Sequence, residues 1–319
     1  MHRMKKKTLI LEQHIHGAFG VDFNTAEVSE ILEVAEKLYK CGIAAFFPTL
    51  VTDSVENIKR QISVIKEAAK TCSMILGIHL EGIFINPEKK GIHNTEHFLP
   101  LTVENYKLIE DEFIKIVTLA PELDEGLISY LHSKGVKVQA GHCVGSDLLN
   151  VDGVTHTFNA MRPLSHRETG VLGAVLTDSR VNCEMICDLV HLDEATIRII
   201  YGLKGYENIT LVSDTGFMSG LGDGEFIVDG RKRVVKDGVC RNAEGRIAGS
   251  CVSMLAGARN LLRMGIPLEE ISVMASLNPA RALDADKRIG SIESGKRADL
   301  IVCDSDLNIK AVFVKGKRI

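Results

Sequence analysis

The sequence predicts an α/β protein built on a (β/α)8 TIM-type barrel, with a reduced small β-sandwich side domain. Short apolar runs alternate with amphipathic stretches of helical period, which is the order of parallel strands joined by helices. The runs are apolar nearly throughout, as in strands whose two faces are both covered. Eight such units are enough to close a barrel. An open doubly wound sheet is the alternative, but no Gly-x-Gly-x-x-Gly follows the first strand.

The elements follow one another in a regular order. A helical pattern runs from about Thr25 to Lys40 and ends at Gly42, and Ser54 is placed to cap the next helix. Helices over Val252–Met264 and Pro267–Ser276 complete the outer ring. The predicted barrel strands are Thr8–Ile15, Ile43–Leu50, Met74–Leu80, Ile114–Leu119, Val136–Ala140, Gly153–Phe158, Cys183–Val190 and Ile209–Ser213.

Two segments interrupt this alternation. Residues 226–250 are rich in Val, Gly and charge, which predicts a hairpin insertion. The tail has two short β-like runs, Asp299–Cys303 and Ala311–Val314, which predict a small side sheet. We therefore expect a barrel over residues 8–285, and a remnant of a small β side domain over residues 286–319 together with the N-terminal residues.

Composition and charge argue against several classes of protein. The 38 Lys and Arg residues are balanced by 42 Asp and Glu, for a net charge of −4. This balance gives no support to a basic nucleic-acid-binding surface or a polybasic membrane anchor. No apolar stretch has the length of a signal-peptide core or a membrane span. The eight cysteines form no CxxC pair, so we expect reduced thiols in a cytoplasmic protein.

The most informative feature is the position of the histidines and acids. Glu81 and Asp214 lie at the carboxyl ends of predicted strands. In a parallel barrel these ends meet on one face, where active sites are built. Six of the eleven histidines lie at or just beyond such ends, namely His14, His16, His79, His142, His156 and His191.

This distribution predicts a metal centre. His14 and His16 point to the same side of an extended strand, so both can bind one cation. With Glu81, His142, His156 and Asp214 they form an imidazole and carboxylate set that suits Zn²⁺, Fe²⁺ or a similar divalent metal. Each of these residues also has a purely structural interpretation. Glu81 could form an ion pair, Asp214 could cap a turn, and His79 could hydrogen-bond to the backbone.

The chemistry that follows from such a centre is metal-assisted hydrolysis. A bound divalent cation lowers the pKa of water toward neutrality and polarises a carbonyl. An adjacent carboxylate takes the proton of the water and returns it to a leaving amine. Asp214, at the end of the last strand, is the candidate for this general base and acid.

Several short motifs follow one another in order along nearly the whole chain. They are His14-Ile-His-Gly17, His79-Leu-Glu-Gly82, Asn86-Pro-Glu-Lys-Lys-Gly-Ile-His93, Gly141-His142, Thr155-His-Thr-Phe-Asn-Ala-Met161, Leu211-Val-Ser-Asp214, Ala248-Gly-Ser250, Asn278-Pro-Ala280 and Gly290-Ser-Ile-Glu-Ser-Gly-Lys-Arg-Ala-Asp-Leu300. This series resembles that of the N-acetylglucosamine-6-phosphate deacetylases of the amidohydrolase superfamily. The resemblance implies a (β/α)8 barrel beside a small β-sandwich, and removal of acetyl from an amino sugar phosphate.

The resemblance also implies roles for single residues. Glu81, His142 and His156 match the main metal ligands, and His14 and His16 match a pair that some members use for a second metal, so the resemblance implies one or two divalent metals per subunit. Asp214 matches the catalytic acid and base. Members are commonly dimers, so a homodimer is expected. The positions that match substrate contacts are Ile92, Asn159, Ala160, Arg167, His191, Ile247, Ala248 and Gly249.

This sequence departs from the family at several points. Members usually carry a longer segment before the first barrel strand, so the side domain is expected to be reduced. Ile83 and Thr169 each replace a Pro of the family pattern, and Leu189 replaces a Gly. Thr169 and Leu189 lie near the expected sugar phosphate, so they bear on the substrate more than on the metal.

Three hypotheses follow. The first is deacetylation of N-acetylglucosamine 6-phosphate to glucosamine 6-phosphate and acetate. The second is another amidohydrolase reaction, on a different N-acyl sugar or a cyclic amide. The third is a sugar-phosphate-binding protein without catalytic activity, against which the complete ligand series argues, because buried charges without a function destabilise a fold. Arg167, in a polar loop, is the candidate for phosphate, which a guanidinium can hold by two hydrogen bonds.

Overall fold

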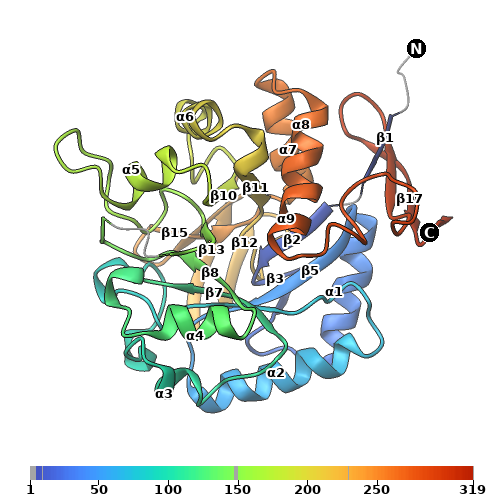
Figure 1. The fold of residues 1–319 in the computed structure, drawn as a ribbon. Coiled ribbons are helices and arrows are strands. Elements are labelled where there is room, and N and C mark those ends of the chain that lie inside the picture. The colour runs from blue at the N-terminus through green and yellow to red at the C-terminus, as the bar shows by residue number, and fades with distance from the viewer. Residues whose placement is uncertain (1–4, 9, 147–149, 229, 319) are drawn as a thin grey trace.

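Eight parallel strands form the centre of the computed structural model, which describes residues 5–8, 10–146, 150–228 and 230–318 (Figure 1). The strands follow the order β11-β10-β9-β8-β7-β6-β5-β2. Their bounds are β2 (Ile10–Ile15), β5 (Ile43–Leu50), β6 (Ile78–Glu81), β7 (Ile114–Leu119), β8 (Lys137–Ala140), β9 (Gly153–Val154), β10 (Asn182–Ile186) and β11 (Ile209–Val212).

Backbone contacts between the first and last strands bring the two edges of this sheet together. Asp214 N donates to His14 O at 3.0 Å, and His16 N donates to Thr215 O at 2.8 Å. Ile15 and Thr215 form a parallel bridge. The predicted (β/α)8 barrel is therefore confirmed, with β2 and the end of β11 as its closing seam.

The strand ends differ from the prediction where the backbone turns. Met74–Leu80 was expected to be one strand, but β6 begins at Ile78, and the chain before it bridges to β5 only at Ile75. The predicted strand over residues 153–158 ends at Val154, because His156 and Phe158 have left-handed φ angles of 29° and 77°. Extended strands cannot contain such residues.

Helices cover the outside of the barrel (Figure 1). α1 buries Ile31, Val34 and Leu38 against the core, and Ser54 caps α2 by accepting from Asn57 N. The helix predicted over Pro267–Ser276 is α-helical only to Ser272, and a π-helical turn begins at Val273. The helices are α1 (Val28–Lys40), α2 (Val55–Ala69), α3 (Val103–Tyr106), α4 (Leu127–Ser133), α5 (Gly170–Thr177), α6 (Glu194–Lys204), α7 (Met254–Arg263), α8 (Leu268–Ser272) and α9 (Asn278–Ala282). Short turns are η1 (Pro87–Lys89), η2 (Thr95–His97), η3 (Pro121–Leu123), η4 (Tyr206–Asn208) and η5 (Val273–Leu277).

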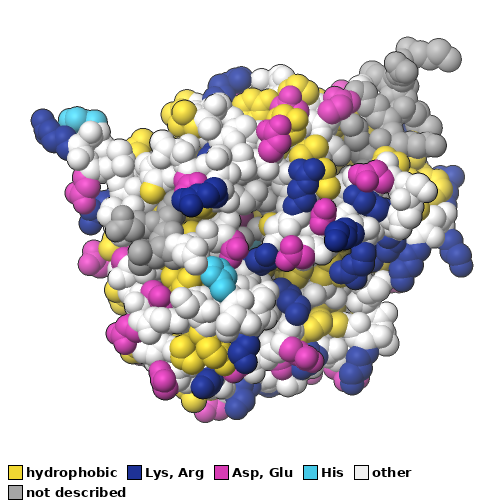
Figure 2. Space-filling model, in the orientation of Figure 1, with side chains coloured by type: hydrophobic (Ala, Val, Ile, Leu, Met, Phe, Trp, Pro, Cys, Tyr) yellow, Lys and Arg dark blue, Asp and Glu magenta, His cyan; other side chains and the backbone are white. Residues whose placement is uncertain are grey.

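No helix within the described ranges has the length and apolar character needed to cross a membrane. Acidic and basic side chains are interspersed over the face shown in Figure 2.

The segment expected to be a hairpin insertion forms a four-stranded antiparallel sheet. Its strands are β12 (Gly224–Val228), β13 (Arg231–Lys236), β14 (Val239–Asn242) and β15 (Ile247–Ser250), in that order. Ser250 N donates to Asp214 O at 3.0 Å, which attaches β15 to the closing seam of the barrel. The insertion therefore stands beside the carboxyl ends of the barrel strands.

A second four-stranded sheet joins the two ends of the chain. β1 (Lys5–Thr8) pairs antiparallel with β16 (Leu300–Cys303), which pairs with β17 (Ile309–Val314) and then β18 (Lys317–Arg318). Figure 1 shows β1 and β17 together at the right of the barrel. Ile301 and Val312 pack against Ala44 of β5. A short hairpin of β3 (Gly17–Ala18) and β4 (Val21–Asp22) follows β2.

We expect Phe46→Ala to lower the free energy of unfolding by about 3–5 kcal/mol, because the truncation leaves a cavity in the core. Phe46 is fully buried on β5, and its ring lies 5.9 Å from that of Phe23. Urea denaturation measures the change. Ile227→Ala is the control, since Ile227 on β12 is 67% exposed and should shift stability by less than about 0.5 kcal/mol. Equal effects of the two substitutions would contradict this account of the core.

Candidate metal centre and active site

The carboxyl ends of five barrel strands, β2, β6, β8, β9 and β11, bring one cluster of imidazoles and carboxylates together. The cluster is buried, with His14 fully enclosed and Glu81 3% exposed. His142, His156 and Asp214 follow β8, β9 and β11 directly, with left-handed φ angles of 49°, 29° and 51°. These turns aim the three side chains away from the strand direction, and strained backbone of this kind is concentrated at functional sites. The cluster consists of His14, His16, Glu81, His142, His156 and Asp214.

The carboxylate of Glu81 faces two groups of donors, one with each oxygen. Oε1 lies 2.9 Å from His156 Nε2 and 3.3 Å from His142 Nε2, and these two nitrogens are 3.1 Å apart. Oε2 lies 3.1 Å from His16 Nε2 and 3.5 Å from His14 Nε2. Asp214 Oδ1 lies 3.1 Å from His16 Nε2 and 3.4 Å from His14 Nε2. Glu81 therefore lies between two potential cation positions.

These spacings fit ligands of a small divalent cation. A tetrahedral centre with bonds of about 2.0–2.1 Å has ligand-to-ligand distances of about 3.3 Å, which is close to the distances around Glu81. Imidazole nitrogens and carboxylate oxygens are the donors that zinc and iron accept.

In two of the rings, a hydrogen bond at Nδ1 determines that Nε2, which faces Glu81, carries a lone pair. His142 Nδ1 donates to Lys89 O at 2.7 Å, and His16 Nδ1 donates to Thr49 O at 3.2 Å. A carbonyl can only accept, so in the neutral rings Nε2 carries no hydrogen. Nitrogen and oxygen lone pairs repel one another at 3 Å unless positive charge lies among them. The donor set therefore fits a bound cation.

The electrostatics of the cluster lead to the same conclusion. Burial alone lowers the pKa of His16, but hydrogen bonds with Asp214 and Glu81 outweigh it and raise the pKa to about 9. Burial raises the pKa of Glu81, but the charge of His14 and hydrogen bonds from the imidazoles bring it well below its usual value. The buried carboxylates thus require positive charge beside them, and either protons or a metal cation can supply it.

Glu184 is a functional residue that the sequence reasoning missed. It is fully buried on β10, where its carboxylate accepts from His14 Nδ1 at 2.9 Å and from Gln13 Nε2 at 2.7 Å. The hydrogen bond from His14 Nδ1 orients the ring so that Nε2 faces Glu81. In the sequence, Glu184 could have been recognised only as a single acid within the apolar run Cys183–Ile186.

His79 and His93 lie beside the cluster in different ways. His79 Nδ1 faces Gln13 O at 3.0 Å and Nε2 faces Thr118 Oγ1 at 2.7 Å, so neither nitrogen is free for a metal. Burial lowers its pKa to about 3 and keeps it neutral. His93, which the sequence reasoning did not select, has Nε2 3.8 Å from Glu81 Oε2. Its place at the end of the Asn86–His93 motif was the only signal.

Most residues expected to contact substrate lie around the cluster. Asn159 and Ala160 follow His156 directly, and Asn159 Nδ2 donates to His156 O at 3.2 Å. His191 Nδ1 lies 2.7 Å from Asp188 Oδ2. Burial lowers the pKa of His191, but the hydrogen bond with Asp188 outweighs it, and the net pKa is raised. The segment Ile247, Ala248 and Gly249 belongs to β15, beside Asp214.

Ile92 and Arg167 lie further out. Ile92 is 39% exposed and lines a cavity of about 530 Å³ between residues 90–94 and strands β13 and β14. Arg167 is exposed, and within the described part of the chain it forms no hydrogen bond or ion pair. The structure therefore does not bring Arg167 into contact with the cluster. The charged side chains lining the cavity are Lys90, Lys232, Arg233, Glu244 and Arg246.

Comparisons with known proteins agree with this architecture. Residues 9–319 match the sequence profile of the amidohydrolase family. The chain is 31% identical to the N-acetylgalactosamine-6-phosphate deacetylase of Escherichia coli O157:H7, over 96% of this chain and 85% of that protein. It is 32% identical to the N-acetylglucosamine-6-phosphate deacetylase of Vibrio furnissii, over 97% of this chain and 82% of that protein.

Solved structures of deacetylases superpose on nearly the whole chain. The N-acetylglucosamine-6-phosphate deacetylase of Thermotoga maritima has a TM-score of 0.91 and 32% identity, over 98% of this chain and 88% of that chain. A mutant of the Mycobacterium smegmatis enzyme in complex with N-acetyl-D-glucosamine-6-phosphate has a TM-score of 0.91 and 30% identity, over 99% of this chain and 87% of that chain.

We expect Glu184→Gln to weaken metal binding about 10–100-fold, because the ring of His14 loses the carboxylate that orients it. Competition with a chromophoric chelator measures zinc affinity. His132→Gln is the control, since His132 pairs with Asp152 on the outside of the barrel and should leave the affinity unchanged. Unaltered affinity in Glu184→Gln would show that Glu184 has no such orienting role.

Proposed function

The chain belongs to the amidohydrolase family, and from this premise we propose that it deacetylates N-acetylglucosamine 6-phosphate, giving glucosamine 6-phosphate and acetate. The observation that carries the proposal is the cluster around Glu81 at the mouth of the barrel. It combines a donor set that suits a divalent metal with a second carboxylate, Asp214, that can carry a proton, as metal-assisted hydrolysis of an amide requires. The similarity to deacetylases along nearly the whole chain supports the choice of substrate.

Two metal positions are proposed, with zinc or iron as the first candidates. Glu81, His142 and His156 would hold one cation through Oε1 and the two Nε2 atoms. His14 and His16, with Asp214 and the second oxygen of Glu81, would hold another. A divalent cation bound there lowers the pKa of water and polarises the acetamide carbonyl.

Asp214 is proposed to move the proton. Burial raises its pKa, but the charge of His14 and the hydrogen bond from His16 lower it below its usual value, so Asp214 is ionised at neutral pH. Its oxygen can therefore accept the proton of the attacking water and pass it to the sugar nitrogen as the C–N bond breaks. Its backbone is held on both sides, by His14 O and by Ser250 N.

The remaining residues are proposed to bind the sugar phosphate. With Nδ1 bonded to Asp188, His191 has Nε2 available for a sugar oxygen. The exposed guanidinium of Arg167 is proposed to meet the phosphate with two parallel hydrogen bonds. Ile92, Asn159, Ala160 and the segment 247–249 would line the rest of the site.

A second candidate substrate is N-acetylgalactosamine 6-phosphate. The relative from Escherichia coli O157:H7 carries that name, and the two sugars differ in the configuration of one hydroxyl group. Leu189 lies two residues before His191 with a left-handed φ of 63° and 44% exposure, where the deacetylase pattern has Gly. Acetate release from the two phosphorylated sugars, measured in parallel, distinguishes the candidates.

The proposed activity predicts that zinc-loaded protein releases acetate from N-acetylglucosamine 6-phosphate. Asp214→Asn should reduce the rate about 10²–10⁴-fold, because an amide cannot accept the proton. Removing the metal with a chelator should abolish release, and adding zinc back should restore it. Equal rates in Asp214→Asn and the unmodified protein would refute the role of Asp214. Sugar binding without acetate release at any metal loading would favour the non-catalytic hypothesis.

Arg167→Ala tests the phosphate contact separately from the chemistry. The variant should raise KM for the phosphorylated sugar about 10-fold or more, because a charge-assisted pair is lost. It should leave the slow hydrolysis of unphosphorylated N-acetylglucosamine unchanged. Exposed Arg180, held by Asp178 on another loop, gives the control variant Arg180→Ala. A similar loss for both sugars would contradict a phosphate-specific role.

A further inference from the structure

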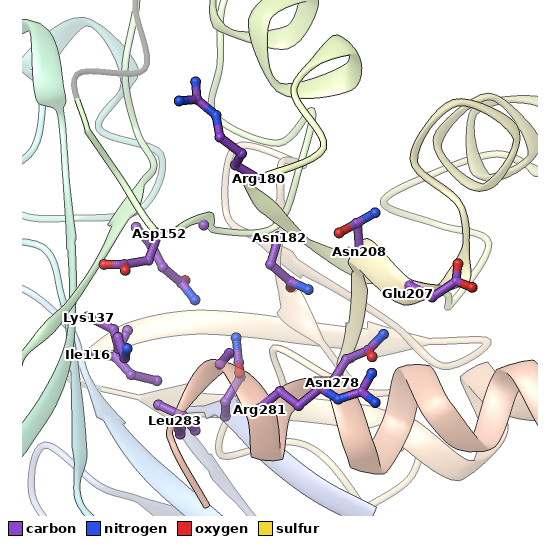
Figure 3. Close-up of a pocket in the computed structure, with 14 residues that line it drawn as sticks. Ile116, Lys137, Asp152, Arg180, Asn182, Glu207, Asn208, Asn278, Arg281 and Leu283 are labelled. Atoms are coloured by element: carbon purple, nitrogen blue, oxygen red, sulfur yellow. The ribbon is translucent and has the colours of Figure 1, made fainter. Parts of the chain in front are cut away.

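The carboxylate of Asp188 lies where two segments of the barrel mouth meet. Asp188 follows β10 by two residues, Ser250 is the last residue of β15, and the Asp188 side chain is only 3% exposed. The polar pocket of Figure 3 lies at the other end of the barrel, since Lys137 and Asn182, which line it, are the first residues of β8 and β10. Asp188 is therefore on the side of the barrel that carries the candidate metal centre.

Both oxygens of the Asp188 carboxylate accept two hydrogen bonds. Oδ1 accepts from Val190 N and from His191 N, each at 2.9 Å. Oδ2 accepts from His191 Nδ1 at 2.7 Å and from Ser250 Oγ at 3.2 Å. An ionised carboxylate offers about four such positions, so the acceptor capacity of Asp188 is filled. One oxygen thus holds the turn that carries His191, and the other joins the ring of His191 to β15.

The turn between Asp188 and His191 is strained without these bonds. Leu189 has a left-handed φ of 63°, which is unfavourable for a residue with a Cβ atom. Its side chain is 44% exposed, so packing against the core compensates little of this cost. The backbone bonds to Oδ1 of Asp188 therefore hold the turn in the conformation that places His191 at the mouth.

Ser250 extends the junction to the candidate general base. Its Oγ donates to Asp188 and accepts from Val252 N at 3.1 Å, and its backbone N donates to Asp214 O at 3.0 Å. The segment 247–249, which is expected to contact the sugar, directly precedes Ser250 on β15. The position of this segment is therefore fixed through Asp188 as well as through the closing seam of the barrel.

Asp188 and His191 stabilise each other's charge. Burial raises the pKa of Asp188, but the hydrogen bonds and the charge of His191 outweigh it, and the net pKa is lowered. Burial lowers the pKa of His191, but Asp188 outweighs it with a smaller contribution from the charge of Asp214. Because Nδ1 is committed to Asp188, Nε2 is the nitrogen of His191 that is left for a ligand.

We propose that Asp188 is a positioning residue that fixes the ring of His191 and the segment 247–250 relative to each other, so that both meet the same sugar. Asp188 itself does not contact the substrate, and it acts only through His191 and Ser250. The identity of the sugar rests on the proposed function, whereas the positioning of His191 by Asp188 can be measured without any sugar.

The titration of His191 in zinc-loaded protein, followed by NMR of labelled histidines, tests the first contact. Asp188→Asn keeps the shape of the side chain but removes its charge. The pKa of His191 should then fall below its usual value of 6.5, because burial outweighs the remaining attraction of Asp214. Asp193→Asn is the matched control, since Asp193 accepts from Thr196 N to cap α6, and it should leave the titration unchanged. An unaltered titration of His191 in Asp188→Asn would overturn the proposal.

Ser250→Ala tests the contact with β15 and should shift the same titration in the opposite direction. With one donor fewer, the carboxylate of Asp188 attracts the proton of His191 more strongly, so the pKa of His191 should rise. In the Asp188→Asn background the effect should be smaller, because the carboxylate through which it acts is gone. Ser253→Ala, which removes the cap of α7, is the control and should have no effect. No rise with Ser250→Ala, or equal effects in both backgrounds, would overturn the coupling.

Steady-state kinetics distinguish positioning from a role in the chemical step. Asp188→Asn should raise KM for N-acetylglucosamine 6-phosphate about 10-fold, with kcat changed less than about twofold, as when binding is lost equally in the ground state and the transition state. Unchanged KM, or a fall in kcat without a rise in KM, would contradict the assignment. If the unmodified protein releases no acetate, the proposed function fails, and the two titrations still decide the role of Asp188.

Discussion

The hydrogen bonds that close the barrel between β2 and the end of β11 are the interaction on which the rest of the structure depends. They join His14 and His16 to Asp214 and Thr215, residues about two hundred positions apart in the chain. Without this seam His14 and His16 would lose the carboxylate of Asp214, which lies 3.4 Å and 3.1 Å from their Nε2 atoms. The same seam carries β15, because Ser250 N bonds Asp214 O. Barrel closure, the acid of the site and the attachment of the insertion are therefore one structural unit.

The site requires backbone strain, and the surrounding fold maintains it. Left-handed conformations in residues other than Gly cost about 1–3 kcal/mol each. His142, His156 and Asp214 all adopt them directly after strands. β8 and β9 are each paired on both sides, and Asp214 N is bonded to His14 O across the seam, so the turns cannot relax without breaking the barrel. The rigid strands thus hold the three side chains in converging positions, as a metal site requires.

Buried charge in the barrel interior is arranged in layers. Glu81 and Asp214 face the imidazoles directly, and Glu184 holds the far side of His14. Gln13 joins Glu184 to His79, since its side-chain amide donates to the carboxylate and its backbone carbonyl accepts from His79 Nδ1. One continuous hydrogen-bonded chain therefore runs through the barrel interior. Removing a single member would leave a buried charge without its partner, which is the most destabilising kind of change in such a network.

The sequence alone determined the barrel and most of the candidate site. Apolar runs of strand length are a local property, so they could be located without coordinates. Because parallel strands order their carboxyl ends on one face, the residues there could be grouped as well. Glu184 and His93 could not be found in this way, since their partners His14 and Glu81 are distant in sequence and a single buried acid or histidine carries little signal. Tertiary structure alone decided the closing seam, the exposed position of Arg167 and the docking of the four-stranded insertion. The physical reason is that each of these depends on which segments pack against each other, and that is set by the whole chain rather than by any local pattern.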